Sequence, residues 1–214
     1  MLNAKKIKAT GGSRVAQENI EPGNYNARVV QVIDLGLQDI SSKAYGEKPP
    51  ANQLWVTFEL SNEFMVDEKG LPDAEKPRWL SRRINLFSMS AEMATSTKWM
   101  DAIDPKGSLE GDWGRVLGMP CTLTVINKES GGKVYDNIGA VSPVMRGMVV
   151  PELVNDPVMF DISMPDMDVY NSLPDFLKDI IKGNLEFQGS ALDVALSGGT
   201  PSVDDEIDDD DIPY

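Results

Sequence analysis

Aromatic and cationic residues recur closely in the segment RWLSRRINLF, residues 78–87. It places Trp79, Arg82, Arg83 and Phe87 within nine residues. Arginine side chains neutralise phosphate groups, and aromatic rings stack on unpaired bases, each stacked base contributing roughly 1–3 kcal/mol. This combination is typical of a groove that holds single-stranded nucleic acid.

Segments expected to lie beside this one contain the same residue types. They add eight candidates for the groove: Arg28, Lys43, Tyr45, Lys48, Trp55, Lys128, Lys133 and Tyr135. A structural interpretation stays open for several candidates. Phe87, like Trp99, could pack in the core under a helix, and Arg82 and Arg83 could pair with the acidic stretch 61–77. The hypothesis therefore depends on the combination of residues on one face.

Strands are the elements expected to position these side chains. Alternation predicts a long strand in GNYNARVVQVIDLGLQ, covered in part on both faces, and a second strand in QLWVTFEL with Trp55 opposite the inward apolar residues. RWLSRRINLF repeats the pattern as a third strand. The segment SMSAEMATSTKWMDAI predicts a helix with Met93, Trp99, Met100 and Ile103 on one face. Two more strands are predicted around Gly131-Gly132, which signal a hairpin.

Three strands, a helix and two strands follow the order of the OB-fold, a five-stranded, partly open barrel. Its second and third strands and neighbouring loops bind oligonucleotides. We therefore expect a mainly β protein whose OB-fold domain spans residues 21–150, with a helix between strands 3 and 4. A flexible basic arm over residues 1–20 precedes the domain.

Two further segments are expected after the barrel. Residues 151–190 predict a linker rich in Pro, Met and Asp, and one C-terminal helix that packs on the barrel. The apolar stripe of this helix would be Phe176, Leu177, Ile180 and Ile181. Residues 191–214 predict a disordered acidic tail.

The net charge of −14 arises from the last third of the chain. Residues 1–151 contain 18 Lys and Arg and 18 Asp and Glu, whereas residues 152–214 contain 2 and 16. The chain ends in DDEIDDDDIPY, with seven carboxylates in eleven residues and an aromatic residue last. A featureless acidic tail would only aid solubility. An apolar anchor beside a free carboxylate instead favours capture by a hydrophobic pocket with a basic rim.

The absence of histidine and the single cysteine, Cys121, narrow the chemistry. They exclude intrachain disulfides, Cys/His zinc sites and histidine-based acid–base catalysis. Cys121 lies in the apolar run MPCTLTVI and is predicted to be a buried core residue. Asp161, Asp166 and Asp168 lack the glycine of an EF-hand loop, so no metal site is expected there. We expect no cofactor and no enzymatic activity.

The last residues, DDDDIPY, are similar to the C-terminal tip of bacterial single-stranded DNA-binding proteins, with Tyr214 replacing their final Phe. The body instead resembles bacteriophage single-stranded DNA-binding proteins in GNYNARVVQVIDLGLQ, LWVTFEL, RRINLFSMS and LPDFLKDII. The resemblance implies an OB-fold followed by a helix, and a tip that recruits replication and repair enzymes. The partner-binding residues that it implies are Asp208, Asp209, Asp210, Asp211, Ile212, Pro213 and Tyr214.

Together these features predict a protein that coats and protects single-stranded DNA without sequence preference in phage replication or recombination. Polymerase, helicase or nuclease partners would bind the tip, and the tethered carboxylates would compete with phosphates for the basic groove. The chain has no apolar run of about 18 residues, so we expect it in the cytoplasm of the infected bacterium and not in a membrane. Homo-oligomerisation is left open. The alternative is an acidic DNA mimic or inhibitor that binds another protein's DNA-binding surface.

Overall fold

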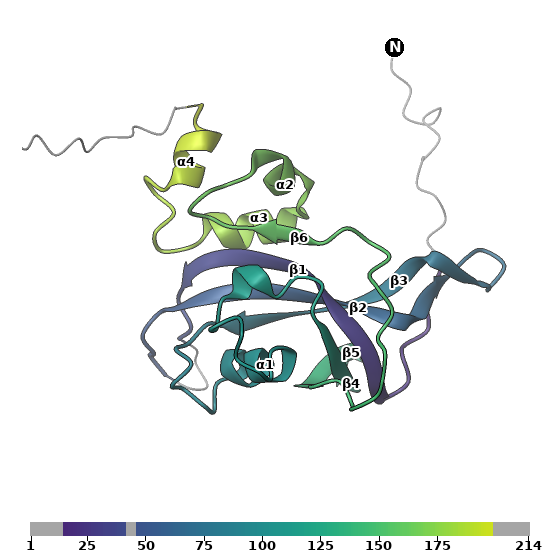
Figure 1. Cartoon of the computed structure of the whole chain (residues 1–214). Helices are drawn as coiled ribbons and strands as arrows, with labels where there is room; N and C mark the ends of the chain where they lie inside the picture. The colour runs from purple at the N-terminus through teal and green to yellow at the C-terminus, as the bar shows by residue number, and fades with distance from the viewer. Residues whose placement is uncertain (1–14, 42–45, 199–214) are drawn as a thin grey trace, which may run out of the picture. The chain divides into compact units, whose positions relative to one another are not determined.

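The structure is a computed structural model that describes residues 15–41 and 46–198. Its elements are labelled in Figure 1. In chain order they are β1 (Gly23–Gln38), β2 (Ala51–Val66), β3 (Pro72–Asn85), α1 (Thr95–Ile103), the 3-10 turn η2 (Trp113–Arg115), β4 (Pro120–Ser130), β5 (Lys133–Ser142), β6 (Val158–Phe160), α2 (Met167–Ser172), α3 (Asp175–Lys182) and α4 (Ala191–Leu196).

The fold is mainly β, as the sequence predicts. Five strands form a curled antiparallel sheet in the order β3-β2-β1-β4-β5, and β6 pairs in parallel with β1. The long first strand is also confirmed, and it buries residues on both faces, including the neighbours Val29 and Val30. Among the described residues, none of the helices combines the length and apolar character needed to span a membrane.

The chain divides into two compact units. Of the described residues, the first unit comprises 15–30, 57–82 and 98–157, and the second comprises 31–41, 46–56, 83–97 and 158–198. β1, β2 and β3 each contribute residues to both units.

In the first unit, β4 and β5 form the hairpin that the sequence predicts. Ser130 pairs with Lys133, so the turn consists of Gly131 and Gly132, whose φ angles are +58° and +73°. Two consecutive positive φ angles define a tight hairpin turn whose twist matches that of its strands, and glycine adopts them without steric cost. β4 also pairs with β1 in the antiparallel sense.

Two arginines of β3 connect the strands at the ends of the sheet order. Arg78 Nη2 lies 3.1 Å from Asp136 Oδ2, and Arg82 Nη1 donates a hydrogen bond of 3.1 Å to the carbonyl of Ile138. Both partners belong to β5. Side chains thus bridge two strands that the backbone ladder leaves at opposite edges.

The stretch 61–77, which the sequence suggests is an acidic connection, is mostly strand. β2 extends to Val66 and β3 begins at Pro72, so only a short turn separates them. Asp67 Oδ1 accepts hydrogen bonds from the backbone N–H groups of Lys69 (2.8 Å) and Leu71 (2.9 Å) and closes the turn. The expectation was wrong because a solvated hairpin can carry charged residues along both of its strands.

The buried face of the first unit includes the helix residue Trp99. Its ring lies 5.3 Å from that of Phe58 in an edge-to-face arrangement, and it is 3% exposed, so the core interpretation of Trp99 is confirmed. Met93 was expected on the apolar face of the helix. It precedes α1 and is 82% exposed, so that expectation was wrong.

In the second unit, the C-terminal segment is folded more fully than a linker with one helix. β6 pairs with residues 31–33 of β1, and helices α2, α3 and α4 follow it. Their apolar residues form one buried cluster with β1: Ile33, Leu35, Phe160, Tyr170, Leu173, Leu177, Ile181 and Leu192. Figure 1 shows α3 alongside β6.

The predicted C-terminal helix is α3, and a separate helix, α2, precedes it. Ser172 ends α2, and Pro174 occupies the position before α3. Proline fixes φ near the helical value but disfavours helical geometry at the preceding residue. The helix is therefore interrupted at Leu173. Residues 191–196, expected within the tail, form α4 because Ser190 caps it and Leu192 is buried.

Candidate nucleic-acid interface

The β4–β5 hairpin of the first unit presents a ring opposite a cation. Lys128 pairs with Tyr135 across the hairpin, and both are exposed, Tyr135 by 50%. Together with Glu129, Ser130 and nearby residues they line a surface recess of about 490 Å³. Among the described residues, neither Lys128 nor Lys133 forms an ion pair. The hairpin thus keeps the Lys128 cation across from an accessible phenol ring, and Lys133 lies on the same strand as that ring.

Trp79 and Arg82, both in the first unit, lie on opposite faces of β3. Trp79 is 42% exposed, and its indole Nε1 donates a hydrogen bond of 3.1 Å to Glu59 Oε2. The Arg82 guanidinium lies 6.0 Å from the centre of the buried Trp99 ring, besides its bond to Ile138. The structure therefore does not bring these two candidates into one groove, because side chains three apart on a strand point to opposite faces.

Glu59 explains why the outward face of β2 in the first unit is covered. It is 3% exposed and accepts hydrogen bonds from the backbone of Val154 (2.6 Å) and from the backbone (3.3 Å) and side chain (2.7 Å) of Asn155. With the indole of Trp79 this makes four N–H donors around one carboxylate. Such donors compensate the cost of burying its charge. Trp79 thus has a structural partner as well as an exposed surface.

Arg28 is held within the first unit by several partners. Its guanidinium donates to the carbonyls of Gly118 (2.7 Å), Val150 (2.9 Å) and Pro151 (2.7 Å), and it forms a 2.7 Å ion pair with Glu152. The side chain is only 14% exposed. Its donors already have acceptors, so of the first-unit candidates it is the least available to a phosphate.

The second unit places Trp55 beside the ring of Phe176, which the sequence does not predict as a binding residue. Trp55 is half-buried, and its ring centre lies 5.4 Å from that of Phe176 on α3, with the two planes inclined by 67°. Phe176 is 49% exposed. Trp55 also contacts the cluster formed by the C-terminal helices. Packing against the C-terminal helices explains why a tryptophan occupies the outward face of this strand.

Arg83 lies on the neighbouring strand of the same unit. Leu86 N–H donates to the Asn52 carbonyl at 2.7 Å, and the Gln53 amide donates to Asn85 Oδ1 at 2.5 Å. Continuing this antiparallel register places Trp55 across from Arg83, and such cross-strand Cβ atoms lie about 4.5–5.5 Å apart. Arg83 is exposed and forms no ion pair with any acidic residue that the structure describes.

The remaining candidates have separate locations. Phe87, also in the second unit, is 43% exposed, which excludes the core interpretation. Lys48 is exposed in the segment before β2. Lys43 and Tyr45 lie outside the described residues, as do the tail residues: Asp208, Asp209, Asp210, Asp211, Ile212, Pro213 and Tyr214.

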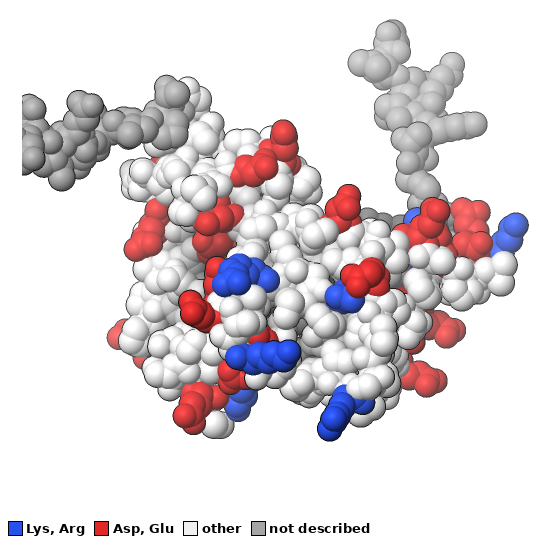
Figure 2. Space-filling view, in the orientation of Figure 1, with Lys and Arg blue, Asp and Glu red and all other residues white. Residues whose placement is uncertain are grey.

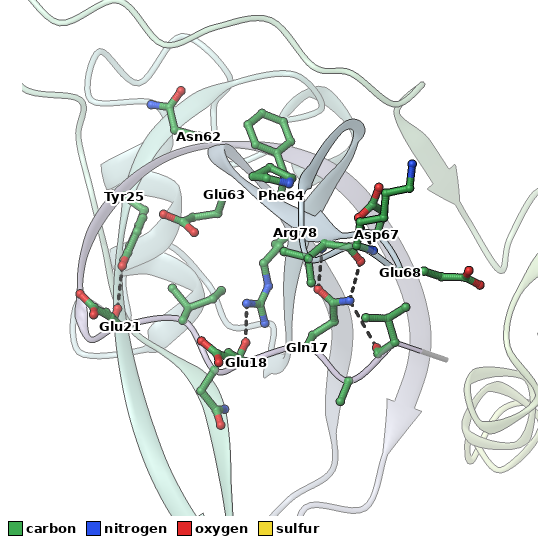
Figure 3. Close-up of a pocket in the computed structure, with 18 residues that line it drawn as sticks. Gln17, Glu18, Glu21, Tyr25, Asn62, Glu63, Phe64, Asp67, Glu68 and Arg78 are labelled. Atoms are coloured by element: carbon green, nitrogen blue, oxygen red, sulfur yellow. Dashed lines mark hydrogen bonds between the residues drawn. The ribbon is translucent and has the colours of Figure 1, made fainter. Parts of the chain in front are cut away.

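A larger recess of about 830 Å³ lies at the start of β1 in the first unit and has the wrong charge for phosphate (Figure 3). Its cations are Lys69 and Arg78, and Arg78 is already bonded to the Glu18 carbonyl and Asp136. Its carboxylates are Glu18, Glu21, Glu63, Asp67 and Glu68. Burial and the nearby carboxylates Glu63 and Glu21 raise the pKa of Tyr25 from its ordinary value. A negatively charged ligand is disfavoured there.

Two observations limit the other chemistry of the described residues. No three His, Cys, Asp or Glu side chains among them are grouped as a metal ion would require. Cys121 is buried, as predicted, and burial raises the pKa of its thiol to about 12, far from the thiolate form that a nucleophile needs. Figure 2 shows acidic and basic side chains interspersed on the face that it displays.

Sequence reasoning missed Phe176 as a site residue because it belongs to an apolar stripe. Phe176 and Ile180 form one row of that stripe, and Leu177 and Ile181 form the next. Only Leu177 and Ile181 are buried.

No family model matches this chain, and no curated protein matches it either.

Proposed function

We propose that this protein binds single-stranded DNA without sequence preference and protects it during phage replication or recombination. One observation carries the proposal: each unit places an accessible ring across from a cation that pairs with no described carboxylate. These pairs are Tyr135 with Lys128 in the first unit and Trp55 with Arg83 in the second. No catalytic role for any residue is part of the proposal.

This arrangement suits unpaired bases because every base has a π-face and every nucleotide carries a phosphate. Stacking contributes roughly 1–3 kcal/mol per base and tolerates any sequence. The two faces of a base in a duplex are already covered by its neighbours. Rings and cations on the β-strands therefore favour single-stranded over duplex DNA because its bases are exposed. They do not distinguish one base from another.

An OB-fold is the finer architecture that we propose for the sheet. The strand order and the arginine bridges from β3 to β5 support a five-stranded barrel that is closed in part by side chains. The C-terminal tip is proposed to recruit replication or recombination enzymes in the bacterial cytoplasm, which follows from the sequence resemblance alone.

Fluorescence anisotropy with labelled oligo-dT and with duplex DNA tests the function. We expect tight binding to dT and weak binding to duplex, with an affinity that falls as salt rises. Lys128→Gln should reduce the slope of log K against log salt by about 0.7, the value for one phosphate contact on a single strand. Lys106→Gln, the same change at an exposed lysine of the first unit, is the control and should leave the slope unchanged.

Failure of the full chain to bind dT at low salt would contradict the proposal. Binding to the DNA-binding surface of another protein, with no affinity for dT, would support the DNA mimic instead.

A further inference from the structure

We infer that Phe176 on α3 and Trp55 on β2 together bind one unpaired base, with Arg83 contacting the adjoining phosphate. This inference rests on the proposed function and adds to it a helix outside the five-stranded sheet. All three residues belong to the second unit. The two rings already touch in an edge-to-face geometry, with centres 5.4 Å apart. A base that stacks on one ring would meet the other at its edge.

The exposed half of the Phe176 ring is accessible to a ligand. On α3, Leu177 and Ile181 are 1% and 0% exposed and hold the helix against the apolar cluster. Phe176, on the neighbouring row of the helix, is 49% exposed. The half of the ring that stays in water gains none of the stabilisation that burial of apolar surface gives. A stacked base would cover that surface.

The position of Arg83 is fixed by two buried amides. Its Nε donates to Gln53 Oε1, and its Nη2 donates to Gln38 Oε1 at 3.2 Å. Both glutamines are 7% exposed. Amide oxygens orient the guanidinium without cancelling its charge, so the cation keeps its attraction for a phosphate. Partial burial lowers the pKa of Arg83, but an arginine remains protonated at neutral pH.

Gln38 also connects Arg83 to the helix that carries Phe176. Its Nε2 donates to the carbonyl of Ile180 on α3 at 3.1 Å and to that of Leu35 at 2.6 Å. One buried side chain therefore contacts both the cation and the helix. This link fixes the position of the Arg83 guanidinium relative to the helix that carries Phe176. A site that binds a base and its phosphate together requires such a fixed arrangement.

Phe176→Leu in the full chain tests the role of the ring. Leucine keeps apolar bulk against Trp55 but cannot stack. We expect dT affinity to fall about fivefold or more, at the lower end of the loss per stacked base, with an unchanged salt slope because no charge is lost. Phe176→Trp should keep the affinity. Leu185→Ala, which shortens another exposed apolar side chain of this unit, is the control and should bind like the unmodified protein.

Arg83→Gln tests the phosphate contact separately. It should lower the slope of log K against log salt by about 0.7 while leaving the ring-dependent loss at Phe176→Leu in place. An unchanged slope would show that Arg83 does not contact a phosphate.

Equal or tighter binding by Phe176→Leu would overturn the inference, since tighter binding means that the ring only covers Trp55. If this variant does not fold, photo-crosslinking of the unmodified protein decides. Iododeoxyuridine within dT should then attach to the peptide that contains Phe176 or Trp55, and attachment only elsewhere would overturn the site. If the unmodified protein does not bind dT, the proposed function itself fails.

Discussion

Glu59 and Tyr170 are both buried polar side chains, but only one of them is satisfied. Glu59 accepts four hydrogen bonds from Trp79, Val154 and Asn155. The Tyr170 hydroxyl is buried and finds no hydrogen-bond partner among the described residues. Removing a satisfied buried acceptor leaves its donors unpaired, whereas removing an unsatisfied hydroxyl loses nothing. The two sites should therefore respond oppositely to mutation.

Glu59→Gln is expected to lower the free energy of unfolding by about 2 kcal/mol. Glutamine replaces one of the two carboxylate oxygens with an NH2 group. That NH2 group would face N–H donors and leave their hydrogen bonds unmade. Urea denaturation measures the change. Tyr170→Phe is the control and should be neutral or slightly stabilising. A stable Glu59→Gln variant would show that the segment around Val154 does not depend on this carboxylate.

The thiol of Cys121 predicts a pH dependence of stability. Its pKa is raised to about 12 in the folded protein, against about 8.5 in an unfolded chain. The stability that this difference contributes is present in full below about pH 8.5 and is lost as pH rises toward 12. The free energy of unfolding should thus fall more steeply between about pH 9 and 11 in the unmodified protein than in Cys121→Val. Parallel pH profiles for the two proteins would contradict the assigned burial.

At the scale of elements, Gly36 controls how α3 joins β1. Its φ is +71°, and a Cβ there would lie 2.8 Å from Cγ of Asn184, directly after the C-cap of α3. Asn184 is 8% exposed and donates to the Ile181 carbonyl at 2.6 Å, so it has little freedom to move. The tight approach lets Leu185 N–H bond to the Leu37 carbonyl at 2.8 Å.

Gly36→Ala should destabilise the protein by about 2–3 kcal/mol, from backbone strain of about 1 kcal/mol plus the clash. Gly70→Ala is the matched control, because Gly70 has φ of +76° but no atom near the added methyl group. It should cost only about 1 kcal/mol. Thermal unfolding measures the loss of stability in both variants. Equal losses would show that the contact with Asn184 does not contribute to the cost of the substitution.

The sequence predicted those strands and turns whose residue pattern is set by neighbouring residues in the chain. Alternating residues identify β1, and the pair Gly131-Gly132 identifies the β4–β5 hairpin, because a tight turn needs residues that accept positive φ. The turn after β2 was missed because Asp67 closes it with its own side chain, while charged residues continue along both strands. α4 was missed because six residues give too short a period to detect.

The candidate site was predicted in part for the same reason. Strand alternation places Trp55 on the outward face of β2. That α3 covers this face is a contact between residues far apart in sequence, and no local pattern encodes it. Arg82 lies three residues from Trp79 along β3 and so points to the opposite face, where it contacts Trp99. The partners of Arg28 come from two separate segments, Gly118 and residues 150–152, both far from it in sequence, so sequence alone could not reveal them.

At the scale of the whole molecule, the charge asymmetry predicts that the tail opposes DNA binding. Residues 1–151 are neutral overall, and the carboxylates of residues 204–214 are tethered to them. Tethering can raise their effective concentration to about millimolar, so we expect them to compete with phosphates for cations such as Lys128 and Arg83.

Deleting residues 204–214 should therefore tighten dT binding severalfold at low salt, with the difference shrinking as salt rises. Anisotropy titrations at two salt concentrations measure this. A matched control replaces only Tyr214 with Ala, which keeps the seven carboxylates and should leave DNA affinity unchanged. Equal affinities with and without the tail would contradict the competition.

Tryptophan fluorescence titrated with oligo-dT at several salt concentrations tests the central claim most directly. Trp99 and Trp113 are 3% and 6% exposed, so a ligand on the surface acts mainly on Trp55 and Trp79. Saturable quenching is predicted, reduced in Trp55→Phe, with log K falling linearly against log salt. Absence of quenching by dT, or binding that does not depend on salt, would contradict the claim that rings and cations of this protein hold single-stranded DNA.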